Sequence, residues 1–188
     1  MRIILILLSC ITLQAQAQYD SLWQQQQQLQ RKGMYVLGSW AVGNIVVSGL
    51  TANAATGSNK AFHQMNVYWN VVNAGIAGAA LLIRPKRLEG NAVVRQQQRI
   101  EKILLFNSGL DVAYITAGAY LQERSRRNGA NSEQLKGFGE SLVLQGAFLL
   151  VFDGVMYLLH NQQGSRLGTP FNISAGTTPH GVGLLVQF

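Results

Sequence analysis

The sequence predicts an all-α membrane protein: a four-helix transmembrane bundle with a short C-terminal β-hairpin. Three observations lead to this fold class. Four nearly uncharged segments have the length of a membrane-spanning helix, polar stretches separate them, and the spacing of apolar residues changes near the C-terminus. Charged residues make up only 12 % of the 188 residues, about half of the ~25 % usual in a soluble domain.

The first 17 residues have the pattern of a secretory signal peptide. Arg2 precedes an apolar run from Ile3 to Leu13, and the small residues around Ala17 match a cleavage site. The run is too short to span a bilayer stably. An uncleaved anchor and a lipoprotein signal ending at Cys10 are the alternatives. Cleavage after Ala17 would remove the only cysteine and exclude disulfides, thiolate catalysis and Cys-ligated metals.

A Gln-rich leader, residues 18–32, precedes the segments that form the expected bundle over residues 33–160. We expect the leader to be a solvated spacer, helical or disordered. The four segments are Gly33–Asn53, Phe62–Ile83, Glu101–Gln122 and Gly137–His160. Each has the length of a helix that crosses ~30 Å of hydrocarbon. Gly, Asn, Pro, Lys and Arg gather in the stretches between them, as expected of loops.

A soluble four-helix bundle is the competing interpretation, and the types of polar residue decide against it. A water-facing helix normally carries Lys, Glu and Arg, whereas Lys60 is the only such residue between Gly33 and Ile83. Asn, Gln, Ser, Thr and His are the polar residues that hydrogen-bond between membrane helices, beside small residues that allow close approach. Close helix contacts are therefore predicted at Ser39 with Gly43, Ala74 with Gly78, and Ala113 with Ala117.

Two rules of membrane orientation disagree for this chain. Cleavage of the signal would place the new N-terminus and the loop over residues 84–102 outside the cytoplasm. The outer side would then carry nine Lys and Arg against five inside, opposite to the usual excess of cytoplasmic cations. Either the signal is not cleaved, or the helices do not all span the membrane, or the signal overrides the charge of the loops in setting the orientation.

The tail, residues 161–188, changes from helical to alternating spacing. Apolar residues alternate at Phe171 and Ile173, and again from Val182 to Phe188 after a Gly/Thr/Pro turn. This pattern predicts a β-hairpin. Two strands cannot close a membrane barrel, so we expect the hairpin to lie on the bundle.

Polar residues recur on one face of each segment. In the second segment they lie within ~80° of one another around the helix: His63, Asn66, Asn70 and Asn73. The third segment carries a matching stripe of Asn107, Asp111, Tyr114 and Gly118. The fourth has a looser cluster of Gln145, Asp153 and His160, and the first offers Asn44, Ser48 and Thr51. Such faces predict a bundle with its polar side inward and its apolar side toward lipid, in which the asparagines hydrogen-bond between helices.

Asp111 and Asp153 differ from the neutral polar residues. A carboxylate near the middle of a membrane helix costs ~3 kcal/mol on insertion, so it marks a candidate functional site. The alternative is a structural aspartate that fastens two helices. We take Asp111 as the strongest candidate for contact with a proton, ion or ligand, within a polar site between the second and third segments.

Other classes of function lack a signal in this sequence. His63 could approach Glu140, but one histidine and one glutamate are too few for a metal site. The chain has no nucleophile elbow, phosphate-binding loop or zincin motif. The net charge of +7 comes from cations in loops, which is not a nucleic-acid footprint. We therefore predict a protein that is not an enzyme, holds no cofactor or metal, and binds no nucleic acid.

Four stretches carry a resemblance to a known family. They are "GMYVLGSWAVGNIVVSG" (33–49), "FHQMNVYWNVVNAGIAG" (62–78), "EKILLFNSGLDVAYITAGAYLQER" (101–124) and "LKGFGESLVLQGAFLLVFDGVMYLLH" (135–160). The chain resembles an uncharacterised family of small four-helix membrane proteins from Gram-negative bacteria, classed as a domain of unknown function. The resemblance implies a helical protein of the bacterial cell membrane, most simply the inner membrane. It carries no activity and no catalytic residues.

Two functions of different class follow. The favoured one is a membrane protein that acts by interaction, with the lipid bilayer around it. Its basic 84–102 loop would contact anionic lipid headgroups or another protein. The alternative is a small transporter or ligand-binding bundle with a polar interior around Asp111.

Overall fold

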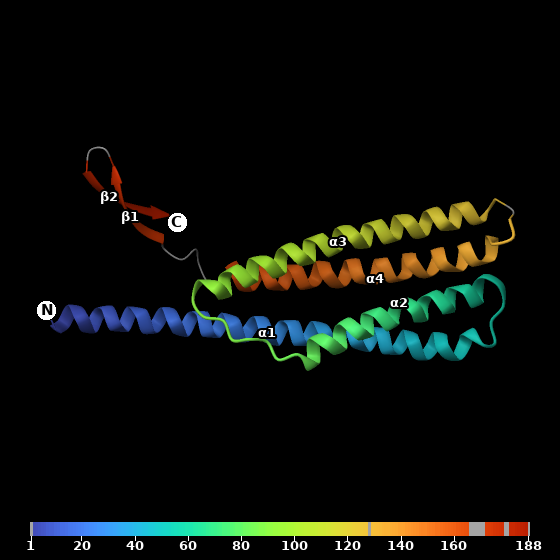
Figure 1. The fold of residues 1–188 in the computed structure, drawn as a ribbon, viewed down its shortest axis with the longest axis horizontal. Helices are drawn as coiled ribbons and strands as arrows, with labels where there is room; N and C mark the ends of the chain where they lie inside the picture. Colours follow the sequence, from blue (N-terminus) through green and yellow to red (C-terminus); the bar gives the residue numbers. More distant parts are fainter. Residues whose placement is uncertain (1, 128, 166–171, 179–180, 188) are drawn as a thin grey trace.

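The computed structural model describes the backbone of residues 2–127, 129–165, 172–178 and 181–187, and the side chains of residues 16–127 and 129–164. The helices are α1 (Arg2–Ala52), α2 (Gly57–Leu82), α3 (Asn91–Ser125) and α4 (Ser132–Ser165). Two strands follow, β1 (Asn172–Thr178) and β2 (Gly181–Gln187). The helices run side by side along the long axis of the molecule, each antiparallel to the next (Figure 1). The predicted all-α four-helix bundle is confirmed.

Helix α1 is one continuous helix of 51 residues, about 77 Å long at 1.5 Å per residue. It includes the expected signal sequence, the leader and the first bundle segment. No glycine or proline occurs before Gly33, and Gln is a good helix former, so nothing in the leader interrupts the helix. Removal of residues 1–17 as a signal peptide stays a prediction.

The leader is not a solvated spacer, and that expectation was wrong. Leu22 is 2 % exposed and Gln26 is fully buried. The side-chain nitrogen of Gln26 donates a hydrogen bond to the backbone oxygen of Val93, at 3.3 Å. One face of the leader is buried because α3 begins early enough to pack along it, while the other face stays exposed.

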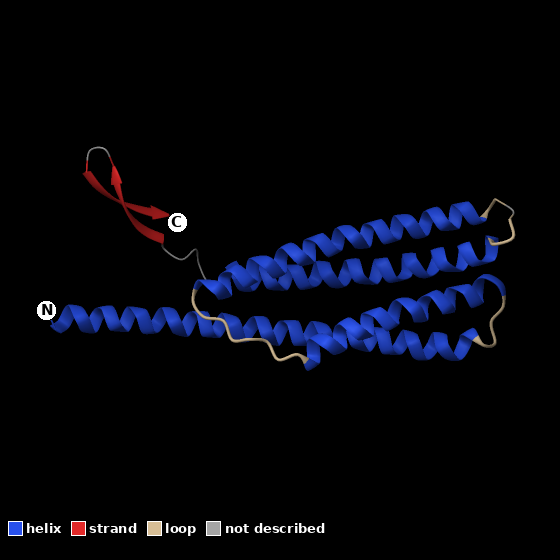
Figure 2. Cartoon of the chain, viewed as in Figure 1, coloured by secondary structure: helices blue, strands red, loops and turns tan. Residues whose placement is uncertain are grey.

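Helix α3 begins at Asn91, ten residues before the predicted start at Glu101. Gly90 takes a positive φ of 54°, a conformation that glycine adopts without strain, and the chain then enters the helix. Val93, Gln97, Ile100 and Leu104 recur at helical spacing and are all buried. The expected loop over residues 84–102 is therefore a short connection that ends at Gly90, followed by three helical turns. Figure 2 draws this connection in tan along α1.

The four helices do not pack evenly. Helix α1 packs on α2, and α4 packs on both α2 and α3. Helices α2 and α3 have no close backbone contact with each other. The bundle is thus open along one side, between two helices that are neighbours in the sequence.

The closest helix contacts occur at glycines other than the predicted ones. A Cβ atom on Gly118 would lie 2.7 Å from the backbone oxygen of Gly139, and one on Gly146 would lie 2.9 Å from the Ile115 side chain. By contrast, a Cβ on Gly43 or Gly78 would meet nothing within 4 Å. The predicted contacts of the Ser39 and Ala74 pairs are wrong, because Ser39 and Gly43 are exposed and half-buried Gly78 faces open space. Ala113 and Ala117 are exposed on α3 in the same way.

The polarity of the bundle is reversed relative to a water-soluble protein. Many buried side chains are polar, namely Gln26, Ser48, Asn66, Asn70, Asn73, Gln97, Asp111, Ser141, Gln145, Asp153 and His160. Large apolar side chains are exposed on every helix, among them Val36, Val47, Tyr68, Val72, Ile103, Phe106, Val151 and Leu158. Among the described residues, two helical stretches are long and apolar enough to cross a membrane: Gln16–Ala52 and Ser132–Gly164.

The two C-terminal strands pair antiparallel, with Asn172 opposite Gln187 and Thr178 opposite Gly181. Neither strand contacts a helix within the described part of the chain, and residues 16–164 contain no strand. The hairpin therefore does not lie on the bundle as expected.

Candidate ligand groove

Two polar regions lie inside the bundle, and the first is a network of amides between α1, α2 and α4. Asn66 on α2 donates to Oδ1 of Asn44 at 2.8 Å and to Oγ of Ser48 at 2.7 Å, both on α1. Gln145 on α4 donates to Oδ1 of Asn66. Its own oxygen accepts from the indole nitrogen of Trp40 at 2.9 Å. The network therefore connects α1, α2 and α4, as hydrogen-bonded amides connect helices in membrane bundles.

His63 and Asn70 belong to this network. The His63 ring nitrogen Nδ1 lies 3.1 Å from the Ser48 hydroxyl. Asn70 donates to the backbone oxygen of Asn66 at 2.8 Å. The prediction that His63, Asn66 and Asn70 line a site between the second and third segments is therefore wrong. Helix α2 turns this part of its polar stripe toward α1 and α4, since α3 does not pack against it.

The second polar region is a groove of about 530 Å³ along the open side of the bundle. Helices α2 and α3 form its two walls, while α1 and α4 form its floor. Its walls are Trp69, Val72, Asn73, Ile76, Ile100, Ile103, Leu104, Asn107, Leu110, Asp111 and Tyr114. Its floor is Gln30, Met34, Leu37, Leu149, Phe152, Asp153, Met156 and His160. The volume lies in the range of small-molecule sites, 300–1,000 Å³.

Five of the predicted site residues meet in this groove: Asn73, Asn107, Asp111, Tyr114 and Asp153. They come from α2, α3 and α4, so no single segment contains the site. The ring of Trp69 meets that of Tyr114 edge to face, with centroids 4.7 Å apart. This contact joins α2 to α3 and closes the groove at one end.

Asp111 and Asp153 form an acidic pair in the groove. The two side chains lie within interaction range of each other, and both are buried, with 3 % and 6 % of their surface exposed. Because two adjacent carboxylates cannot both ionise at ordinary cost, the pair carries at most one negative charge.

Several buried polar atoms around the groove have no hydrogen-bond partner among the described residues. They are Nδ2 of Asn73, Oδ2 of Asp111, Nε1 of Trp69 and both ring nitrogens of His160. Buried polar atoms are nearly always paired in folded proteins. Their concentration on one groove indicates a site that a polar ligand or solvent completes.

His160 and Trp69 were not among the predicted site residues. His160 is fully buried at the end of the groove away from Trp69, and its backbone oxygen accepts from the side chain of Gln97. A signal was present in the sequence, since His160 lies seven residues after Asp153 and thus near the same face of α4. Trp69 gave no such signal, because an aromatic residue in an apolar segment is ordinary.

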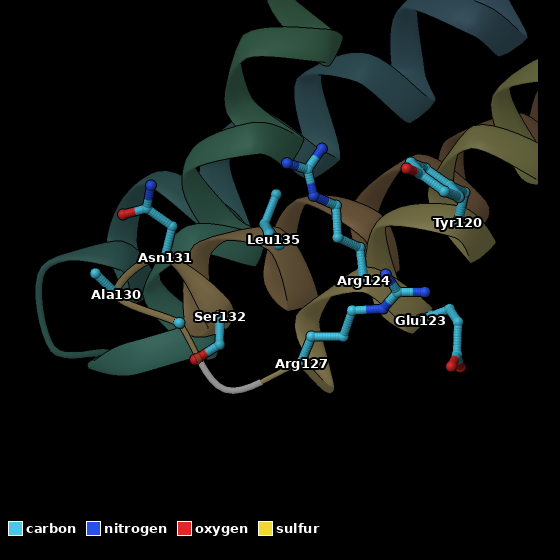
Figure 3. A pocket seen from close by; sticks show the side chains of 9 residues that line it. Tyr120, Glu123, Arg124, Arg127, Ala130, Asn131, Ser132 and Leu135 are labelled. Atoms are coloured by element: carbon cyan, nitrogen blue, oxygen red, sulfur yellow. The ribbon is translucent and has the colours of Figure 1, made fainter.

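A second concavity, of about 640 Å³, lies at the turn between α3 and α4 (Figure 3). It is lined by Tyr120, Glu123, Arg124, Arg127, Gly129, Ala130, Asn131, Ser132 and Leu135. Arg126 beside it pairs with Glu123 at 3.3 Å, and both side chains are mostly exposed. This concavity has no buried polar residue, so it resembles a solvated turn more than a binding site.

A metal centre has no support within the side chains that the structure describes. They contain no group of three or more His, Cys, Asp or Glu residues that could hold a metal ion. His63 contacts Ser48 rather than an acidic residue.

Comparison with known proteins supplies a family. A model of a family of unknown function, DUF6992, matches residues 36–154. The chain belongs to this DUF6992 family. No curated protein and no solved structure matches it. The DUF6992 match agrees with the uncharacterised family that the four stretches resemble, and it covers the amide network and both aspartates. Gln30, Met34, Met156 and His160 of the groove lie outside the matched residues.

Proposed function

We propose that this DUF6992 protein is an integral membrane protein that binds a small molecule in the groove between α2 and α3, without catalysing a reaction. The observation that supports it most is the reversed polarity of the bundle. Among the residues whose side chains the structure describes, eleven polar or charged side chains are buried, while large apolar side chains are exposed on all four helices. In water, the buried polar side chains and the exposed apolar side chains would both be unfavourable. In lipid, both are favourable.

The positions of the charged residues support the same proposal. Helix α1 carries no charged residue after Lys32, and α2 carries none after Lys60. The exposed apolar residues on the helices, such as Val36 to Leu50 and Ile103 to Tyr120, span about 21 to 26 Å at 1.5 Å per residue. Cations lie beyond both ends of this apolar belt. A belt of that height suits the ~30 Å hydrocarbon layer of a bilayer, and the inner membrane of a Gram-negative cell is the location we propose.

Extraction of membranes from cells that express the protein tests integration. Alkaline carbonate and high salt should leave the protein in the membrane pellet, and only detergent should release it. A companion experiment replaces Cys10 with Ser and introduces single cysteines at Val47, Val151 or Lys60. A membrane-impermeant maleimide should label only the Lys60→Cys protein, in opened cells. Release by carbonate, or equal labelling at all three positions, would contradict integration.

The groove suits binding rather than catalysis. It contains acids and amides, but the part of the chain that the structure describes offers no nucleophile activated by a neighbouring base in it. The carboxyl pair and the unpartnered atoms of Asn73 and His160 would instead hold and orient a ligand. Because the groove opens on the lipid-facing side of the bundle, the ligand would enter sideways from the membrane.

Blocking the groove tests ligand binding. Val72 and Ile103 stand on its two walls and are 62 % and 47 % exposed, so Val72→Trp with Ile103→Trp should fill the groove without disturbing the core. Val71→Trp with Leu105→Trp is the matched control, since both residues are equally exposed and face away from it. Mass spectrometry of the purified proteins should find a small molecule bound to wild type and control that is missing from the blocked variant. Identical small-molecule content in all three would end the proposal.

A second candidate function uses the basic end of the bundle. The 84–102 segment carries Arg84, Lys86, Arg95, Arg99 and Lys102, and Arg31 and Lys32 lie at the end of the leader. Arg87 differs from these cations because it forms an ion pair with Asp20, in which the guanidinium nitrogen lies 2.8 Å from the carboxylate oxygen. Cations at the end of an apolar belt suit anionic headgroups or an acidic partner protein. Replacing Arg84, Lys86 and Arg95 with Gln should weaken binding to vesicles rich in anionic lipid. Unchanged binding would remove this candidate.

A further inference from the structure

We propose that the ligand of the groove is an amphiphilic organic cation, a linear apolar chain that carries a protonated amine held by Asp111 and Asp153. This inference rests on the proposed function and narrows it to one chemical class. Three features of the groove support it: two neighbouring acids with no Lys or Arg among the described lining residues, an unpartnered carboxylate oxygen on one of them, and a long apolar trough beside them.

The charge argument begins with what surrounds the acidic pair. Asp111 and Asp153 are neighbouring buried acids, so the pair carries at most one negative charge. No Lys or Arg lines the groove; His160 is the only basic side chain among its lining residues. A buried charge without a counter-ion is strongly unfavourable. A cationic ligand would supply that counter-ion, whereas an anionic ligand would add a second like charge.

The unpartnered carboxylate oxygen of the pair fits an ammonium group. An ammonium has three N–H donors and no acceptor. Oδ2 of Asp111 is a buried acceptor without a partner among the described residues, and Asn107 and Tyr114 on the same face of α3 line the groove beside it. The Trp69 and Tyr114 rings, in contact at 4.7 Å, lie at the same end. Aromatic faces attract cations, so they favour the same charge.

The apolar part of the groove fits a chain rather than a compact molecule. From Tyr114 to Ile100 the groove follows α3 over about 21 Å. Spread over that length, its volume of about 530 Å³ leaves a narrow trough. Ile76, Ile103, Leu104 and Met156 line the part beyond the acids. A chain lying there would be covered by apolar side chains while its amine reached the carboxyl pair.

The binding of matched twelve-carbon probes tests this assignment. The protein is placed in nanodiscs of zwitterionic phosphatidylcholine, and uptake of radiolabelled dodecylamine, dodecanol and dodecanoate is compared with empty nanodiscs at pH 7. Dodecylamine is protonated there, because alkylamines titrate near the pKa of lysine, about 10.4. We expect saturable binding of dodecylamine, at least about tenfold tighter than that of dodecanol, and no binding of dodecanoate.

Substitutions of the two aspartates test whether they hold the amine of the ligand. Asp111→Asn and Asp153→Asn keep shape and hydrogen bonding while they remove the charge, and each should weaken dodecylamine binding about tenfold or more. Having two such variants keeps the test valid if one of them fails to fold. Asp20→Asn is the control, since Asp20 is partly exposed in its pair with Arg87 and lies far from the groove; it should bind as wild type does.

The outcomes separate this inference from the proposed function. If dodecanol binds as tightly as dodecylamine, or if both aspartate variants bind dodecylamine normally, the cation assignment is wrong. In that case, loss of probe binding in the Val72→Trp, Ile103→Trp variant would still support the groove as a ligand site. If no probe binds, the cation assignment fails, and a bound small molecule in wild type that the blocked variant lacks would preserve the proposed function alone.

Discussion

Gln145 and Trp40 are joined by a 2.9 Å hydrogen bond from the indole nitrogen to the amide oxygen, and the amide nitrogen of the same glutamine donates to Asn66. One side chain on α4 thereby connects α1 and α2 in the middle of the bundle. The Trp40 ring also stacks on Phe148, with centroids 3.9 Å apart, so the polar link and an aromatic contact reinforce each other.

Removing that amide should destabilise the bundle. Gln145→Leu would leave the Trp40 N–H and the Asn66 oxygen buried without partners, at a cost of about 1 to 3 kcal/mol. Reversible unfolding in mixed detergent micelles would measure it. Gln134→Leu is the control, because Gln134 is exposed on the same helix and should tolerate the change. Equal stability of the two variants would show that the network contributes nothing.

The glycines that bring α3 and α4 together should not accept a methyl group. Gly118→Ala would place a Cβ 2.7 Å from the Gly139 oxygen, and relief of such overpacking typically costs about 1 to 3 kcal/mol. Gly43→Ala is the matched control, since its Cβ would meet nothing within 4 Å. Alanine favours helix over glycine by about 1 kcal/mol, so Gly43→Ala should be neutral or stabilising. Thermal unfolding of both variants measures whether each substitution raises or lowers the stability of the protein.

The leader should contribute to stability through Leu22. This side chain is 2 % exposed and lies beside Val94 and Gln97 of α3, so Leu22→Ala should lower the free energy of unfolding by about 2 to 3 kcal/mol. Gln24→Ala, on the exposed face of the same turn, should have little effect. A leader that acts only as a solvated spacer would make the two substitutions indistinguishable.

A cation on the outer belt distinguishes a membrane bundle from a soluble one. Val151 is 67 % exposed on α4, so Val151→Lys would be harmless in water. Inside hydrocarbon the same lysine costs roughly 2.5 to 3.5 kcal/mol. We therefore expect Val151→Lys to reduce the amount of protein integrated into membranes, as measured by carbonate extraction. Gln134→Lys lies beyond the belt and should integrate normally.

The Arg87–Asp20 ion pair should matter little. Asp20 raises the pKa of Arg87 above its ordinary value, first through the hydrogen bond and then through its charge, but arginine is protonated at every working pH in any case. Both side chains are substantially exposed, and exposed pairs are screened by water and salt. Arg87→Ala should leave the melting temperature unchanged within error in 150 mM salt. A clear loss of stability would mean that the 84–90 connection is held more firmly to α1 than this pair suggests.

Much of the architecture could be predicted from residue types and spacing. The uncharged lengths of the four segments indicated four helices, and the asparagine and aspartate stripes indicated which faces point inward. Asn66, Asn70, Asn73, Asp111 and Asp153 are all buried, as their spacing predicts. Periodicity carries this information because each residue advances the helix by a fixed angle. Helix ends were less accurate: α3 begins before Glu101 because its first turns are polar by composition and become buried only against the leader.

The partners of each polar face depended on the tertiary structure. His63, Asn66 and Asn73 share one stripe of α2, yet the first two belong to the amide network and the third lines the groove. The difference arises because α2 packs on α1 and α4 but not on α3, and the spacing of one helix contains no information about which neighbour covers which turn. The same reason explains why Gly118 and Gly146 make close contacts while Gly43 and Gly78 make none. Helix periodicity determines which way a side chain points, whereas the packing of helices determines what it meets.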